Sequence, residues 1–493
     1  MSKGLILSLL LGYFLVLILI SYLTGKKSDN STFFTGNRNN KWYVVAFGMI
    51  GASLSGVTFI SIPGVIEGNQ FTYLQMAVGY IIGYFLIAFV LLPLYYRLNV
   101  TSIYSYLEQR YGTVTYKIGA AFFILSRIIG ASLRLYLVAN VLQTFVFDDL
   151  GYPFWLTVTL SILLIWVYTH RGGIKTIIWT DTLQTLFMLI SVGVSVYLIS
   201  DDLNIAFSNL YYEISGFGYG EVWQTDNPLA GNYWWKGILG GMFITLGMTG
   251  VDQDMMQKNL TCANQKEAKK NMISFSIVLF FVNVLFVVLG GLLFLYVDNH
   301  SEMCAAWGEH GYQNDLLFAT ISLEGGLGLT VGVFFLLGLV AAAYSSADSA
   351  LTSLTTSLSV DFFDVEKKEK AEQEKIRKRS HIIMSLALLA TILIFKSMVS
   401  ESVIWELFKA AGFTYGPLLG LFMFGIISKR KVNDVTASAI CIAVAVSVWC
   451  FWKFILPMEF MGGYQFGSEL LGVNALLVFI FLWISSSKQE VQS

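Results

Sequence analysis

The chain has 493 residues, of which 56% are hydrophobic and only 13% are charged, and its formal net charge is −1. A soluble domain carries about twice that share of charged residues. The composition therefore excludes a soluble enzyme and predicts an all-α polytopic membrane protein. A near-zero net charge provides no basic surface for nucleic acid, and the scattered cysteines and histidines show no metal-binding spacing.

Apolar runs long enough to cross a bilayer as helices recur along the whole chain. They predict about thirteen transmembrane helices, at residues 4–23, 43–66, 71–96, 118–147, 153–169, 177–199, 233–256, 273–297, 327–359, 381–398, 403–427, 434–456 and 468–486. The first run has no signal-peptide cleavage motif before Lys26 and Lys27, so we expect it to be a retained helix.

Lysine and arginine gather in every second predicted loop. With the N-terminus outside, the loops that hold Lys26, Arg97, Arg171, Lys258 and the charged run 364–380 are all cytoplasmic. The outer loops contain no lysine or arginine. A miscounted helix would invert every later loop, so this pattern supports the count. It predicts a cytoplasmic C-terminus in a plasma-membrane protein that contacts the lipid bilayer throughout.

Two predicted spans contain helix-weakening residues. Residues 47–64 combine glycines and Pro63 with serines and a threonine, and residues 240–254 combine glycines with Thr245, Thr249 and Asp252. Four spans separate the two segments. A five-helix unit repeated with inverted topology places a broken helix first in each half, with the solute site at the breaks. The predicted organisation is a leading helix and inner loop (1–42), a first repeat (43–199), an outer loop (200–232), a second repeat (233–427), and two trailing helices with a short inner tail (428–493).

The stretch 338–362 is apolar enough for a membrane yet carries oxygen-bearing side chains. On a helix, one face bordered by Asp348 collects small and hydroxyl residues, namely Ala342, Ser345, Ser346, Ser349 and Ser353. Such oxygens can replace the water around a small cation. An intramembrane carboxylate costs about 2.5–3.5 kcal/mol on insertion scales and therefore points to function. The alternative is a face of small residues that only packs helices together.

These segments resemble the sodium/solute symporter family, which includes sodium-coupled sugar, proline, pantothenate and sialic acid transporters. The matching motifs occur in family order: LSGVTFISIPG (54–64), TSIYSYLEQRYG (101–112), GGIKTIIWTDTLQ (172–184), TGVDQDMMQKNL (249–260) and AAAYSSADSALTS (341–353). The resemblance implies a five-plus-five inverted repeat with one leading and two trailing helices. It also implies a sodium-coupled symporter that imports a small polar organic solute by alternating access.

The resemblance further implies two sodium positions, so that one or two Na⁺ ions would move per cycle. The main position would use three backbone carbonyls and two hydroxyls, from Gly51, Leu54, Ala342, Ser345 and Ser346. A second position, similar to one in the sialic acid transporters, would use Asp181, Ser345, Asp348 and Ser349. Asp348 stands where those transporters have serine. Two carboxylates around one Na⁺ leave excess negative charge, so one is expected to be protonated, salt-bridged or shared with the main position. Alternatively, Asp181 only reaches the inner interface.

Solute is expected between the two broken helices and the neighbouring spans. The candidate lining residues are Ser53, Ser55, Thr58, Tyr73, Gln75, Thr245, Thr249 and Gln253. The arginine that holds a carboxylate in the sialic acid transporters aligns with Ala131, but Arg127 and Arg134 lie one turn to either side. Either could clamp an anion through a bidentate bond. Alternatively, Arg127 pairs with a structural carboxylate and Arg134 lines the outer vestibule.

The sequence leaves the solute open among a sugar, sialic acid, another carboxylate and an amino acid, with the arginines favouring an anion. Glu406 and Lys409, three residues apart in an apolar span, are expected to pair with each other, with Asp252 or with Arg127. An ion channel or a sodium-independent uniporter of the same fold is the alternative function. The chain shows no nucleophile–base or metal constellation that would indicate an enzyme.

Overall fold

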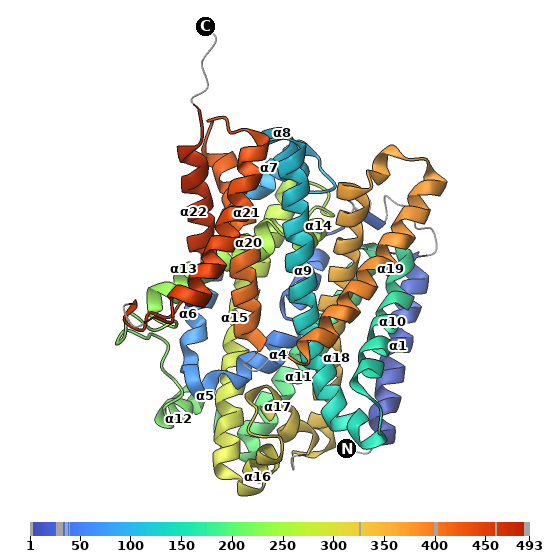
Figure 1. The fold of residues 1–493 in the computed structure, drawn as a ribbon. Helices are drawn as coiled ribbons and strands as arrows, with labels where there is room; N and C mark the ends of the chain where they lie inside the picture. The colour runs from blue at the N-terminus through green and yellow to red at the C-terminus, as the bar shows by residue number, and fades with distance from the viewer. Residues whose placement is uncertain are drawn as a thin grey trace.

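A computed structural model of the chain describes residues 3–25, 33–34, 38, 40–172, 174–324, 327–398, 403–458 and 461–487. In these residues, helices are the regular elements, and β pairing is limited to two isolated bridges. Figure 1 shows a bundle of long helices in which α1 (Lys3–Gly25) starts at one end and α22 (Leu470–Ile484) finishes at the other. Opposite ends for the first and last helices agree with an odd number of spans.

The first half of the chain contains the following long or broken helices: α1 (Lys3–Gly25), α3 (Trp42–Ser53), α4 (Gly56–Gly64), α6 (Tyr73–Leu86), α7 (Leu92–Leu98), α9 (Thr113–Leu142), α10 (Phe154–Gly172) and α11 (Ile174–Asp202). Shorter helices are α5 (Ile66–Asn69), α8 (Ser105–Arg110) and α12 (Leu210–Gly216). A π-helical turn, η3 (Ile87–Leu91), joins α6 to α7.

The second half contains α13 (Trp234–Thr245), α14 (Gln253–Asn259), α15 (Gln265–Asn299), α18 (Gly328–Ser357), α19 (Lys370–Phe395), α20 (Val403–Ile427), α21 (Asp434–Cys450) and α22 (Leu470–Ile484). Two shorter helices, α16 (Ser301–Glu309) and α17 (Asn314–Leu323), precede α18.

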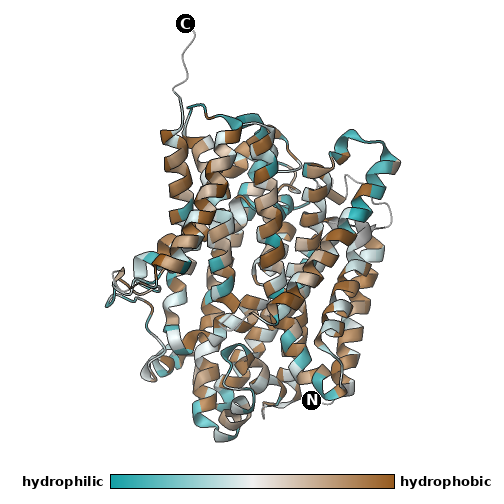
Figure 2. Ribbon diagram, viewed as in Figure 1, coloured by the Kyte–Doolittle hydropathy of each residue, from teal (hydrophilic) through white to brown (hydrophobic). Residues whose placement is uncertain are grey.

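Nine helices in the described part of the chain are long and apolar enough to cross a membrane, and the bent pair α3–α4 makes a tenth. The remaining predicted spans coincide with α10, with α13 followed by α14, and with α22. The described residues thus place a helix at each of the thirteen predicted spans. In Figure 2, hydrophobic residues dominate the helices along the sides of the bundle, and stretches of hydrophilic residues lie mostly toward its two ends.

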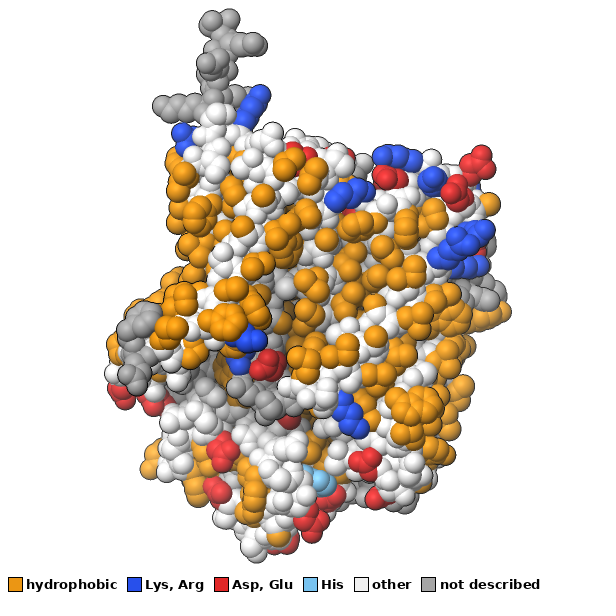
Figure 3. Space-filling model, in the orientation of Figure 1, with side chains coloured by type: hydrophobic (Ala, Val, Ile, Leu, Met, Phe, Trp, Pro, Cys, Tyr) orange, Lys and Arg blue, Asp and Glu red, His pale blue; other side chains and the backbone are white. Residues whose placement is uncertain are grey.

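Charged side chains divide between the two ends of the bundle. On the face shown in Figure 3, lysines and arginines lie mainly at the end near the C-terminus, together with some acidic side chains, whereas acidic side chains outnumber basic ones at the end that holds α16 and α17. This separation is the one expected from the loop charges in the sequence. The charged run 364–380 is largely the start of α19, which begins at Lys370, well before the predicted span.

The predicted outer loop before residue 327 contains two helices rather than a plain connection. Most of α17, from Leu316 to Ser322, is buried. A Cβ on Gly64, the last residue of α4, would lie 2.9 Å from the carbonyl carbon of Asn314. This outer segment therefore packs against the first broken helix.

Candidate functional site

The first helix break lies in the middle of the bundle. Helix α3 ends at Ser53, Leu54 and Ser55 leave the helical conformation, and α4 begins at Gly56. The two helices bend by 53° at this point. Because the last turn of a helix has carbonyls without intrahelical partners, the bend supplies backbone oxygens inside the protein. The predicted break within 47–64 is confirmed.

The second break has a different local form. A π-helical turn, η7 (Leu246–Gly250), follows α13, and the chain then leaves the helix at Val251 and Asp252. Asp252 caps α14 by accepting a hydrogen bond of 3.1 Å from the Met255 backbone N–H. This cap explains why the chain re-enters a helix at once. The predicted break within 240–254 is confirmed.

The serine-rich helix α18 runs beside the first break and is buried over its whole second half. A Cβ on Gly338 would lie 2.8 Å from the ring of Phe59 in α4. On the other side, a Cβ on Gly51 would lie 3.1 Å from the Asp181 carbonyl oxygen, and the Asp181 carboxylate accepts a 2.7 Å hydrogen bond from Ser345 Oγ. The structure thus brings Gly51, Asp181 and Ser345 together, although α3, α11 and α18 are far apart in the sequence.

Three buried oxygens of α18 have no hydrogen-bond partner within the described residues. They are Ser346 Oγ, Asp348 Oδ1 and Thr352 Oγ1. The other Asp348 oxygen accepts a 2.8 Å bond from the Tyr168 hydroxyl. Since buried polar atoms are normally hydrogen-bonded, Ser346 Oγ and Asp348 Oδ1, on the predicted sodium face, are available to a ligand such as a cation.

Asp181 is salt-bridged, which was one of the expected alternatives for the two carboxylates. Lys258 Nζ lies 2.7 Å from Asp181 Oδ2, with side-chain exposures of 1% and 0%. Lys258 was predicted to lie in a cytoplasmic loop, and this was wrong. It follows the second break on α14, which is packed inside the bundle, so charge counting alone misplaced it.

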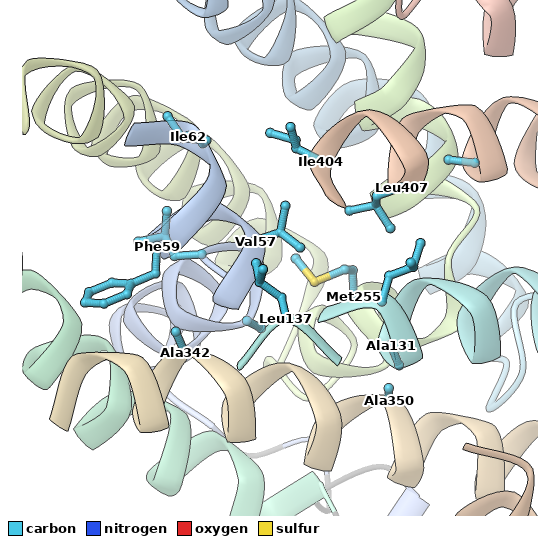
Figure 4. Close-up of a cluster of buried hydrophobic side chains, with 14 of the residues drawn as sticks. Val57, Phe59, Ile62, Ala131, Leu137, Met255, Ala342, Ala350, Ile404 and Leu407 are labelled. Carbon is cyan, nitrogen blue, oxygen red and sulfur yellow. The ribbon is translucent and has the colours of Figure 1, made fainter. Parts of the chain in front are cut away.

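A cavity of about 90 Å³ lies between the two breaks. Its lining includes most of the predicted solute residues: Ser53, Ser55, Thr58, Tyr73, Arg127, Arg134, Thr245 and Thr249. It also includes residues that the sequence did not indicate, among them Tyr80, Tyr84, Met248 and Asn283. Figure 4 shows apolar neighbours of this region from separate helices, with Val57 of α4, Met255 of α14 and Leu407 of α20 facing a common space.

Two predicted solute residues lie outside the lining of this cavity. Gln75 donates a 2.7 Å hydrogen bond to the Val222 carbonyl in the outer segment. Gln253 accepts a bond of 2.9 Å from the Ile103 N–H and donates one of 2.8 Å to the Thr101 carbonyl. Both carboxamides therefore bind backbone, although Gln75 Oε1 has no partner among the described residues, and their contact with solute stays a prediction.

The two arginines have different surroundings. Arg127 Nη2 contacts Asp254 Oδ2, and its Nη1 lies 3.9 Å from Asp252 Oδ2. Arg134 is buried, lines the same cavity, and makes no ion pair with any described residue; its Nε also lacks a partner there. Of the predicted alternatives, Arg127 pairs with a carboxylate inside the protein, and Arg134 lines the cavity.

The expected pair near the outer end is present. Lys409 Nζ lies 3.1 Å from Glu406 Oε1, one turn earlier on α20. Lys409 and Phe408 line a second cavity of about 340 Å³, bounded also by Asn69 and Asn232. Phe408 lines the central cavity as well, so its side chain borders both spaces.

Sequence reasoning missed Asp254 and the placement of Lys258. The sequence did carry a signal for them, because DQDMMQK puts Asp254 and Lys258 within one short buried helix and Asp252 at its N-cap. Intramembrane charges are rare and usually paired, so this density could have indicated ion pairs. The partners, however, lie on other helices and are not visible in the local sequence.

Comparisons with known proteins were consistent with this geometry. The model of the sodium:solute symporter family matches residues 33–441. The sodium/sialic acid symporter SiaT of Proteus mirabilis is 26% identical over 463 residues, covering 90% of this chain and 87% of that protein. The mouse sodium-coupled monocarboxylate transporter 2 is 25% identical over 442 residues, covering 88% of this chain and 69% of that protein.

Solved structures share the fold. The substrate-bound outward-open state of a Na⁺-coupled sialic acid symporter superimposes with a TM-score of 0.84 at 20% identity, covering 99% of this chain and 100% of the other. Mhp1, a nucleobase-cation-symport-1 family transporter, gives a TM-score of 0.57 at 13% identity, covering 92% and 94%. The family model spans most of the sequence, and the chain therefore belongs to the sodium:solute symporter family.

Proposed function

We propose that this sodium-coupled symporter imports a small organic anion, held at the two helix breaks by Arg134. The observation that carries the proposal is a buried guanidinium that lines the central cavity without an ion-pair partner in the described residues. Removing an isolated charge from water is strongly unfavourable unless it is paired. An anionic solute supplies the missing partner, and a planar guanidinium matches a carboxylate through two parallel hydrogen bonds.

The main sodium position in this proposal joins the first broken helix to α18. Its oxygens come from residues on both sides of that contact: Gly51, Leu54, Ala342, Ser345 and Ser346. The partnerless Ser346 Oγ supports the assignment. So does the tight packing of Gly51 on Asp181, which places the break next to the Ser345 hydroxyl.

Sodium and solute are coupled because they share the same broken helix. Ser53, Ser55 and Thr58 lie on the cavity side of the break that would bind Na⁺, so an ion that fixes the break also fixes these solute contacts. By linkage, solute must tighten Na⁺ binding by the same factor. Each Na⁺ that enters down about 100 mV contributes about 2.3 kcal/mol, which is enough to concentrate solute well over tenfold.

The central cavity favours a small solute. A volume of about 90 Å³ corresponds to roughly six to nine water-sized positions. A short monocarboxylate fits that space better than a sialic acid does. Because no acidic residue lines the cavity within the described residues, the ammonium of an amino acid would have no carboxylate there.

The remaining assignments complete the proposal. The repeats are residues 43–199 and 233–427, and the protein lies in the plasma membrane with its N-terminus outside and its C-terminus in the cytoplasm. The clustering of lysine and arginine at the end near the C-terminus supports this orientation. Phe408 then borders both an outer vestibule and the central cavity.

Uptake into liposomes containing the purified protein tests the proposal. An inward Na⁺ gradient is applied, with K⁺ as the control cation, and the solutes are short monocarboxylates, sialic acid, neutral sugars and amino acids. We expect saturable, Na⁺-dependent uptake of short monocarboxylates. Na⁺-dependent uptake of a neutral sugar alone would refute the anion assignment, and unitary currents without saturable uptake would indicate a channel.

A further inference from the structure

All four residues predicted for a second sodium position have at least one protein partner, although Asp348 Oδ1 has none among the described residues. Asp181 uses one oxygen for Ser345 and the other for Lys258, each at 2.7 Å. Ser349 Oγ donates to Asp254. Asp348 accepts a 2.8 Å bond from the hydroxyl of Tyr168.

The positive charge among these groups is the ammonium of a protein side chain, Lys258. The side chain of Lys258 is 1% exposed, and its Nζ donates to the Asp181 carboxylate. The helix that carries it is held in place, because Gln257 next in the chain donates bonds of 2.6 Å to the Phe34 carbonyl and 3.1 Å to Thr356 Oγ1. The ammonium is therefore fixed at the carboxylate that a second Na⁺ would need.

An ammonium and a sodium ion carry the same charge, and they compete for the same carboxylate oxygens. A Na⁺ next to Asp181 would have to displace a hydrogen-bonded donor and would lie close to a like charge in a medium of low dielectric. The main position shares Ser345 with this cluster, but Ser346 Oγ is free of partners and none of the five ligand residues forms an ion pair in the described part of the chain.

We propose that the Lys258 ammonium takes the place of a second sodium ion, so that this symporter binds one Na⁺ per transport cycle. This inference rests on the proposed function, since it assumes that the main position at the first break binds Na⁺. It assigns Lys258 as the residue that sets the sodium stoichiometry.

The stoichiometry can be measured without knowing the solute. Equilibrium binding of radioactive Na⁺ to the purified protein, at constant ionic strength maintained with choline, reports the ions bound per chain. We expect one Na⁺ per chain, with a Hill coefficient near one. In Lys258→Gln the second position is freed, and we expect two Na⁺ per chain and a Hill coefficient above one. Lys258→Arg keeps the positive charge and should stay at one.

Lys236 offers a matched control. It is also a fully buried lysine, but it donates to the carbonyls of Leu229 and Gln465, remote in sequence from the serine-rich helix. Lys236→Gln should leave one Na⁺ per chain. If Lys258→Gln does not fold, Lys258→Gln combined with Asp181→Asn removes both charges, and its Na⁺ count should remain one because the second position has lost the carboxylate that Lys258 occupies.

Several outcomes would overturn the inference. Two Na⁺ in the unaltered protein would show that Lys258 does not replace an ion, and one Na⁺ in a folded Lys258→Gln would show that the Asp181–Lys258 pair is only structural. A count of two in the double variant would place any second ion elsewhere. Absence of Na⁺ binding in the unaltered protein would instead refute the main sodium position, which separates the two failures.

Discussion

Arg127 of α9 and Asp254 of α14 form an ion pair in the interior of the bundle, with side chains only 4% and 1% exposed. Asp254 lies just after the second helix break, and it also accepts a hydrogen bond from Ser349 of α18. The pair and the Ser349 bond together connect α9, α14 and α18 around the cavity, and Asp254 neutralises the charge of Arg127. The neighbouring Arg134, which lines the same cavity, is left without an ion-pair partner among the described residues.

Breaking this pair should destabilise the protein. Arg127→Met leaves Asp254 buried without a cation, which typically costs about 3–5 kcal/mol. Thermal or denaturant unfolding in detergent measures the loss. Arg127→Met combined with Asp254→Asn should recover most of the stability, because the uncompensated charge is gone. Equal stability of the single variant and the unaltered protein would contradict a structural role for the pair.

Arg134 should be required for binding of the solute and not for binding of Na⁺. Arg134→Gln should abolish uptake of an anionic solute, and Arg134→Lys should raise KM by roughly ten- to a hundredfold because a lysine cannot make the bidentate bond. Stabilisation by Na⁺ should be unchanged in both variants, which serves as the internal control for folding. Normal anion uptake in Arg134→Gln would exclude this residue as the clamp.

The hydroxyl pair of α18 should be required for the response to sodium. Ser345→Ala combined with Ser346→Ala removes two of five predicted ligand oxygens, so Na⁺ stimulation of uptake should be lost while the protein stays folded. Ser353→Ala is the matched control, because that hydroxyl bonds within its own helix to the Ala350 carbonyl at 3.0 Å. Undiminished sodium-driven uptake in the double variant would count decisively against the site.

Removal of sodium should lower the stability of the unaltered protein. Binding only to the folded state stabilises it by about 2.7 kcal/mol when the ligand is at a hundred times its Kd. Melting temperature should therefore rise with Na⁺ concentration at constant ionic strength, and replacement by K⁺ should remove the increase. Equal melting temperatures in saturating Na⁺ and in K⁺ would mean that no selective sodium site exists.

Helices α6 and α13 pack so closely that a methyl group added at a glycine between them should not fit. A Cβ on Gly79 would lie 2.9 Å from the Met242 backbone nitrogen, and one on Gly241 would lie 2.9 Å from the Met76 carbonyl carbon. Backbone cannot yield as a side chain can, so Gly79→Ala or Gly241→Ala should cost several kcal/mol, about as much as severe overpacking. Unfolding measurements will show the loss.

Gly193 of α11 is the control for this experiment, since a Cβ there meets nothing within 4 Å. Gly193→Ala should be neutral or stabilising by up to about 1 kcal/mol, as expected for alanine over glycine in a helix. Equal effects of alanine at positions 79 and 193 would show that α6 and α13 are not packed so closely.

Much of the architecture was predictable because a bilayer restricts the backbone. Spans must be helical and apolar, so the thirteen helices and the two breaks could be found from apolar runs and from clusters of glycine and proline. The stripe of hydroxyls on α18 was visible for a related reason: Ser345, Ser346 and Ser349 recur at helical spacing, and the helix is buried there as predicted.

Side-chain partnerships were not predictable in the same way. Lys258 looked like an inner-loop charge, yet its partner Asp181 lies 77 residues earlier on another helix. Gln75 and Gln253 looked like solute contacts, but their amides bind backbone of segments about 150 residues away.

Amino-acid order alone was thus sufficient for the spans, the breaks, the family and the coupled ion, because these depend on local hydropathy and on motifs that are contiguous in the chain. The packing of distant helices was needed to assign Arg127 to Asp254, to leave Arg134 facing the cavity and to place an ammonium at Asp181. A charge buried in a bundle is paired with whatever neighbour the fold brings to it, and Arg127 and Asp254 are separated by 127 positions.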